Sequence, residues 1–141
     1  MNQREIVLAA LAPAKGAQHS PVQVQKLLFL VDRKIPELVG GPHFDFHPYH
    51  YGPFDSGVYG VLEGLAQEGH VDITWEGRLR LYRLTVTGQR LGDKLLRKLP
   101  DKARKYVETL SGFVRELSFS TLLSVIYEKY PEMRANSVFQ G

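Results

Sequence analysis

The 141-residue chain contains no cysteine, which excludes disulfide bonds and any metal site built on thiolates. It also contains no apolar run close to the roughly 20 residues that a membrane-spanning helix needs. The first twelve residues pair an acid with a base and have only a short apolar patch, which is unlike a secretory signal. These absences favour a cytoplasmic protein with no membrane segment.

Sequence motifs of catalysis are lacking as well. The serines lie in no nucleophile elbow, there is no P-loop, and no G-x-G-x-x-G follows an expected strand. We therefore expect neither an enzyme nor a bound cofactor. The net charge of +3 is mildly basic, so it permits an anionic partner without requiring one.

Hydrophobic periodicity is the main signal that is present. Apolar residues make up 43% of the chain and charged residues 23%, a balance that supports a folded core. A hydroxyl followed by a proline, Ser20-Pro21, is typical of a helix start. The helix that follows is expected to bury a stripe at three- and four-residue spacing, made of Val24, Leu27, Leu28 and Val31.

The middle of the chain has the order of a winged helix. Residues 47–51 look extended, a turn is expected at Gly52-Pro53, and the amphipathic helix that follows stops at Gly69. Alternation over 71–75 and 78–84 predicts a hairpin, and a new helix is expected to begin near Thr85 and to include residues 89–96. This order favours one helix and one wing presented to a partner.

After Pro100 the pattern becomes purely helical, with helices expected at about 103–117 and 119–130. The expected fold is therefore α+β and mostly helical, with a winged-helix-like core over residues 1–99. Residues 100–141 would form a helical extension packed on the core or on a second subunit. A homodimer is expected because this extension offers apolar surface at Phe113, Val114, Leu117 and Phe119.

Several short motifs follow one another between Ser20 and Gly88. They are Gln25-Lys-Leu-Leu-Phe-Leu30, Tyr51-Gly-Pro-Phe54, Gly57-Val-Tyr59, Gly69-His-Val71 and Leu84-Thr-Val-Thr-Gly88. With the first three the chain resembles the Panacea or SocA-like antitoxin domain. With the last two, and with Ile126-Tyr-Glu-Lys-Tyr-Pro131, it is more similar to the uncharacterised YwgA-like bacterial proteins.

The resemblance implies a non-enzymatic module that acts by masking a protein partner, such as a toxin. SocA-like domains usually carry Ala-Trp before the Gly-Pro turn, whereas this chain has Tyr49-His50-Tyr51. This difference favours the YwgA-like proteins and leaves the identity of the partner open.

The turn and the helix after it form the expected partner-binding surface. Exposed aromatic and imidazole groups can anchor a protein, and glycines let another backbone approach closely. The residues assigned to this surface are Tyr49, His50, Tyr51, Gly57, Tyr59 and Gly60. The alternative is structural, with Tyr51 and Phe54 filling space beneath the turn.

A winged-helix DNA-binding regulator is the alternative function. Basic residues on the wing and at the next helical junction can contact phosphates, namely Arg78, Arg80, Arg83, Lys94, Arg97, Lys98, Lys102 and Lys105. The helix after Pro53, however, carries acids and glycines and no lysine or arginine, which suits a protein surface better than the major groove. Any nucleic-acid binding is therefore expected to be weak.

His43, Asp45 and His47 are the weakest candidates, as ligands of a divalent metal ion. In an extended chain their side chains would share one face, and imidazole with carboxylate suits zinc. No metalloenzyme spacing surrounds them, and such residues also cap turns in exposed loops. No metal is therefore assigned to the chain.

Overall fold

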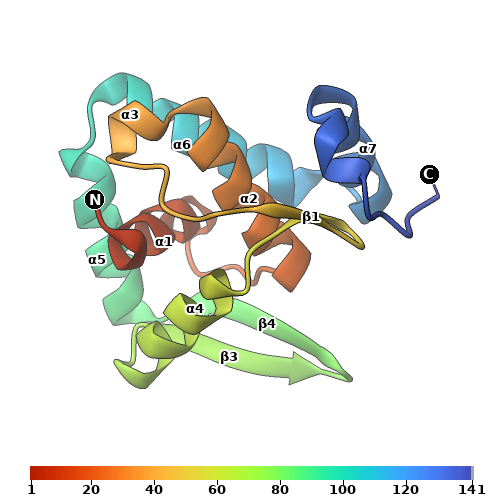
Figure 1. The fold of residues 1–141 in the computed structure, drawn as a ribbon. Coiled ribbons are helices and arrows are strands. Elements are labelled where there is room, and N and C mark those ends of the chain that lie inside the picture. Colours follow the sequence, from red (N-terminus) through yellow and green to blue (C-terminus); the bar gives the residue numbers. More distant parts are fainter. Residues whose placement is uncertain (141) are drawn as a thin grey trace.

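Helix α2 lies at the centre of a mostly helical α+β fold (Figure 1), which is the predicted class. The computed structural model describes residues 1–140. In chain order the α-helices are α1 (Gln3–Leu11), α2 (Pro21–Lys34), α3 (Pro36–Val39), α4 (Gly57–Gln67), α5 (Val86–Lys98), α6 (Asp101–Glu116) and α7 (Phe119–Lys129). Short 3₁₀ segments occupy Ala12–Ala14 and Pro131–Arg134.

The sequence around Ser20 fixes where α2 begins. The Ser20 hydroxyl accepts a hydrogen bond from the Gln23 amide, and the Gln23 side chain accepts one from the Ser20 amide, so both ends of the capping box are closed. The expected apolar stripe is buried, but so is every other residue from Val24 to Asp32. The reason is that α1, α6, β2 and β4 all pack against α2.

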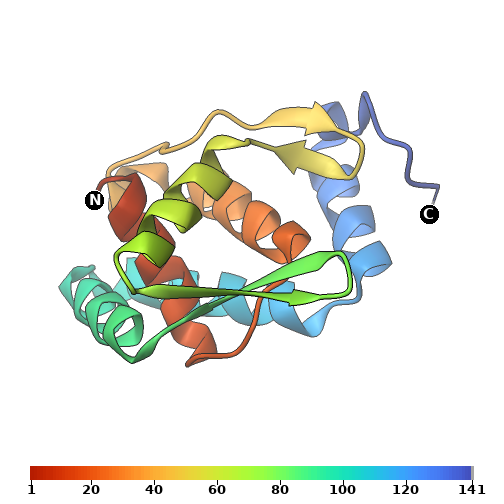
Figure 2. The ribbon, with the colours of Figure 1, turned by 90° about the horizontal axis from the view of Figure 1, so that it is seen from below.

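The winged order is confirmed by α4, the hairpin of β3 (Val71–Glu76) and β4 (Leu79–Leu84), and then α5. Helix α5 begins at Val86, as the expected start near Thr85 predicts, because the Thr85 hydroxyl accepts from the Gly88 amide and caps it. Near α5 the β3–β4 hairpin buries Val71, Tyr82 and Leu84, and its far end leaves Trp75 65% exposed. In both views the hairpin extends toward the end of the molecule that carries α7 (Figures 1 and 2).

A second, shorter hairpin joins β1 (His47–Tyr49) to β2 (Gly52–Phe54), with Pro48 opposite Pro53. The turn expected at Gly52-Pro53 is wrong by two residues, because His50 and Tyr51 form it. Gly52 follows the turn with a φ of +87°, a left-handed value that glycine adopts freely. The glycine therefore closes the hairpin and does not sit at its tip.

The two helices expected after Pro100 are confirmed as α6 and α7. Helix α6 packs against α1 and α2, and its buried residues belong to the same hydrophobic cluster as theirs. Of the residues expected at a dimer contact, Val114 is fully buried, Phe113 and Leu117 are half-buried, and Phe119 is exposed. Among residues 1–140, no helix is both long and apolar enough to cross a bilayer.

Candidate functional site

Polar side chains of α2 hold the short β1–β2 hairpin. The Gln25 amide group donates to the Asp55 carbonyl and accepts from the Asp55 backbone amide, both at 3.0 Å. The Lys26 ammonium donates to the Pro53 carbonyl at 3.1 Å. Pro48 and Pro53 have no backbone N–H, so they cannot donate hydrogen bonds to a further strand. Side chains of α2 supply hydrogen bonds to this segment instead.

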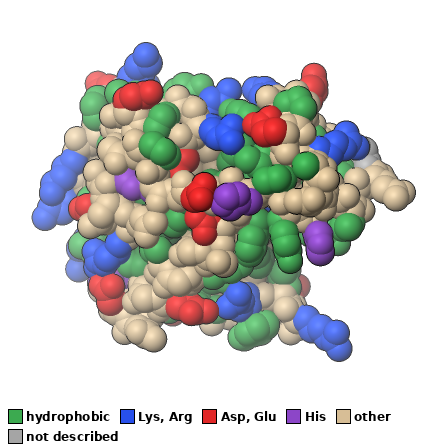
Figure 3. Space-filling view, in the orientation of Figure 1, with side chains coloured by type: hydrophobic (Ala, Val, Ile, Leu, Met, Phe, Trp, Pro, Cys, Tyr) green, Lys and Arg blue, Asp and Glu red, His purple; other side chains and the backbone are tan. Residues whose placement is uncertain are grey.

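A cleft of about 150 Å³ opens between this hairpin, α2 and α4, and we call it the aromatic cleft. Seen from below, α4 lies between the two hairpins (Figure 2), and hydrophobic side chains gather between them on the surface (Figure 3). The residues that line the cleft are Val22, Gln25, Lys26, Tyr49, Tyr51, Gly52, Phe54 and Tyr59.

Aromatic contacts continue from the aromatic cleft in both directions. The Tyr49 ring lies between those of His50 and Phe54, with centroids 4.4 Å and 5.1 Å away. Phe54 meets Tyr59 edge-on at 5.8 Å, and the Arg80 guanidinium lies 5.2 Å above the Tyr59 ring. A row of flat groups therefore links the tip of one hairpin to the wing.

Lys26 contributes the charged group of the aromatic cleft. It is 2% exposed, and burial lowers the pKa of its ammonium to about 7. Within residues 1–140, its side chain makes one hydrogen bond, to the Pro53 carbonyl, and no carboxylate pairs with it. Since an ammonium has three N–H donors and a neutral amine two, Lys26 keeps at least one donor for a carbonyl or carboxylate brought by a ligand.

The structure brings together half of the expected partner-binding residues. Tyr49, Tyr51 and Tyr59 line the aromatic cleft, and His50 is stacked outside it on Tyr49. Gly57 and Gly60 do not line it but lie on the exposed side of α4. A methyl group at Gly60 would meet no described atom within 4 Å, whereas one at Gly57 would touch the Asp55 carboxylate at 3.0 Å.

Sequence reasoning missed the polar floor made by Gln25 and Lys26. It also missed the carboxyl-terminal tail, which ties down the hairpin tip. The Val138 amide donates to the His50 carbonyl at 3.0 Å, and the Asn136 side chain donates to the Pro48 carbonyl at 3.1 Å. The Gln25-Lys26 pair was visible only as part of a motif, and no pattern marks the tail.

The basic residues of the alternative function fall into separate groups. On the wing, Arg80 pairs with Glu63 and Arg83 with Asp72, each at 3.4 Å, whereas Arg78 makes no ion pair within residues 1–140. Lys94, Arg97 and Lys98 are exposed on α5. Lys102 and Lys105 lie on α6 and line a different groove. The set therefore does not form one continuous surface with the aromatic cleft.

The candidate metal ligands do not converge on one point. The His43 ring bonds to the Val39 carbonyl at 2.8 Å, and the His43 amide donates to the Asp32 carboxylate. Asp45 and His47 contact each other at 3.0 Å on the exposed surface. Across residues 1–140 there is no group of three or more histidines or carboxylates that can hold a metal ion.

Comparison with known proteins assigns no family. No protein-family model matches the chain, and a search of curated proteins finds no significant match. The resemblance to the SocA-like domain therefore rests on the short motifs. Two pairs of these motifs touch in the structure: Gln25-Lys26 bonds to the segment ending at Asp55, and Thr85 bonds to Gly69.

Proposed function

We propose that the protein is a non-enzymatic module that captures a protein partner in the aromatic cleft. The observation that carries the proposal is the convergence of Tyr49, Tyr51 and Tyr59 on one cleft, with Tyr49 49% and Tyr51 47% exposed. Aromatic side chains held by a rigid frame, with one end open to solvent, are the usual anchors of protein interfaces. On the helix that carries Tyr59, Gly60 is exposed and leaves room for a second backbone.

Capture is a better account of this cleft than catalysis. Its described lining contains one amine, one amide and phenols, with no carboxylate, imidazole or activated hydroxyl beside the amine. Burial raises the pKa of the Tyr59 phenol, which keeps that group a neutral hydrogen-bonding partner. The proposal extends to the family: the chain would act like the SocA-like and YwgA-like proteins that its motifs resemble, in the cytoplasm, by masking its partner.

The test is capture of a partner by a tagged protein in native lysate, with the captured protein identified by mass spectrometry and its affinity then measured. The double variant Gly60→Arg with Tyr49→Ala is expected to lose at least about tenfold in affinity, because a bulky charge blocks α4 and an anchor is removed. Its melting temperature should stay close to that of the wild type, since both residues are exposed.

A matched control is Val86→Arg, which also adds an arginine to an exposed helical position, on a residue that is 76% exposed and does not line the cleft. This variant should bind like the wild type. Undiminished capture by the double variant would place the interface elsewhere. A large fall in its melting temperature would return Tyr49 and Gly60 to a structural role.

A further inference from the structure

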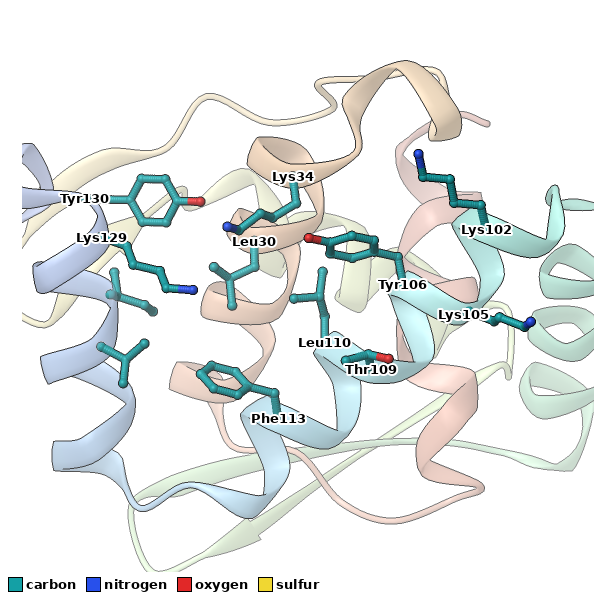
Figure 4. Close-up of a pocket in the computed structure, with 12 residues that line it drawn as sticks. Leu30, Lys34, Lys102, Lys105, Tyr106, Thr109, Leu110, Phe113, Lys129 and Tyr130 are labelled. Carbon is teal, nitrogen blue, oxygen red and sulfur yellow. The ribbon is translucent and has the colours of Figure 1, made fainter.

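A second groove, separate from the aromatic cleft, lies between α2, α6 and α7 (Figure 4). It has a volume of about 390 Å³, which is within the range of small-molecule sites. Its floor is apolar and comes from all three helices, through Leu30, Leu110, Phe113 and Ile126. Such a floor suits a hydrocarbon chain and offers it no hydrogen-bonding partner.

The rim of this groove is basic. Lys34, Lys102, Lys105 and Lys129 line it, all four are exposed, and no acidic residue among those described lines it with them. Within residues 1–140 none of the four makes an ion pair. By contrast, five arginines elsewhere on the molecule are paired with carboxylates, namely Arg4, Arg33, Arg80, Arg83 and Arg104. Four lysines without a carboxylate partner therefore surround one apolar floor, an arrangement that attracts an anionic group to its edge.

The ammonium and hydroxyl groups at the rim of the groove are not spread evenly. In Figure 4, Lys34 and Lys129 extend toward the groove from opposite helices, and the hydroxyls of Tyr106 and Tyr130 point toward it from opposite sides. The Lys34 ammonium lies 6.0 Å from the centre of the Tyr130 ring. Lys102 and Lys105 extend outward in this view. Two ammonium groups and two phenols thus surround one mouth above the floor.

We propose that this groove binds a single-chain amphiphile with an anionic head group. The chain would lie on the floor made by Leu30, Leu110 and Ile126, and the head group, a carboxylate or a phosphate, would be held by Lys34 and Lys129. Charge-assisted hydrogen bonds from two ammonium groups discriminate an anion from a neutral head group of the same size. An acidic amphipathic helix is the competing occupant, but its charges are spaced over several turns, whereas the charges here converge on one mouth.

The experiment is calorimetric titration of the full chain with decanoate and with decyl phosphate, below the concentrations at which they form micelles. Binding of either probe to one site supports the proposal, and the tighter one identifies the head group. Decanol and decyltrimethylammonium, which share the chain but lack the anion, should bind at least about tenfold more weakly. Equal binding of all four probes, or of none, would overturn the proposal.

Variants locate the site. Lys34→Gln with Lys129→Gln should weaken the anionic probes by about tenfold or more and leave decanol unchanged. The control Lys94→Gln with Lys98→Gln removes the same charge from exposed positions of α5 and should have no comparable effect. Thr109→Trp, at an exposed lining position, should fill the groove and weaken every probe.

Equal loss in the α5 control would mean attraction by net charge alone and would overturn the proposal. Binding of an acidic amphipathic peptide in the groove, without binding of decanoate or decyl phosphate, would overturn it as well. All these substitutions lie outside the aromatic cleft, so their effects are separable from partner capture.

Discussion

The two hairpins are held to the core by opposite means. The β3–β4 wing is anchored by apolar burial, since Val71, Tyr82 and Leu84 are all under 6% exposed. The β1–β2 hairpin is anchored by polar groups, through the bonds of Gln25 and Lys26 to its backbone. Apolar burial tolerates little change in shape, whereas a hairpin held by a few hydrogen bonds leaves its aromatic side chains free to face solvent. The second hairpin is therefore the better place for a binding surface.

Glycines show the same contrast. At the base of the wing, the Thr85 hydroxyl donates to the Gly69 carbonyl at 2.7 Å and accepts from the Gly88 amide at 3.1 Å. A methyl group at Gly88 would overlap the His70 carbonyl oxygen, whereas one at Gly60 would meet no described atom. Gly88 is thus required by close packing, and Gly60 lies on a face that the described residues leave open.

The largest expected effect is that of Gly88→Ala. Because backbone on both sides must move to admit one methyl group, the free energy of unfolding should fall by more than about 3 kcal/mol. Gly60→Ala is the matched control, and it should stabilise the protein by about 0.5–1 kcal/mol, since alanine favours an open helical position. Urea denaturation of both variants measures the difference. Similar free energies of unfolding for the two variants would contradict the contrast between close packing at Gly88 and open space at Gly60.

The next largest effect is a pH dependence of the free energy of unfolding that arises from Lys26. Burial lowers the pKa of Lys26 from an ordinary value of 10.5 to about 7. Between these values the unfolded chain binds a proton that the folded protein does not, so the free energy of unfolding rises with pH. The slope should approach about 1.4 kcal/mol per pH unit within this window, and Lys26→Met should abolish it.

An internal control for this prediction comes from beside the wing. His19 pairs its backbone with Tyr82, and burial, reinforced by the charge of Arg115, lowers the pKa of its imidazole from 6.5 to about 4. Stability should therefore fall as the pH drops from 6.5 toward 4, and this acid limb should survive in Lys26→Met. Survival of the alkaline limb in Lys26→Met would contradict the assignment to Lys26, and loss of the acid limb as well would show that the substitution disturbs the surroundings of His19. Chemical denaturation at a series of pH values gives both limbs.

Local signals explain why much of the fold was predictable. The order of α4, the wing and α5, and the two carboxyl-terminal helices, follow from periodicity and from caps at Ser20 and similar positions. The position of the β1–β2 turn was missed because Gly52-Pro53 reads as a turn by itself. Gly52 is instead the residue after the turn, with a left-handed backbone conformation. That placement depends on the packing of the hairpin and cannot be read from the local sequence.

The candidate site was only half predictable. Its aromatic residues are neighbours in the sequence, so one turn and one helix start indicate them. Lys26 bonds to Pro53, which is 27 residues away in the sequence, and Asn136 of the tail bonds to Pro48, which is 88 residues away. No local pattern therefore reveals either contact. A lysine among leucines on a helix ordinarily marks the solvent side, and only the packing of a second segment over α2 buries this one.

The smallest expected effect concerns the wing arginines. It tests whether the β3–β4 wing binds nucleic acid while the β1–β2 hairpin binds a protein. Replacing Arg78, Arg80 and Arg83 by alanine should weaken nucleic-acid binding only severalfold, because two of them already pair with Glu63 and Asp72. Fluorescence anisotropy with unrelated duplexes should show weak binding that falls with salt and a smaller salt slope in the variant. The loss should be the same for every duplex, because phosphate contacts carry no base information. Tight binding to one sequence that survives all three substitutions would make the wing irrelevant and would favour a DNA-binding regulator over a module for protein capture.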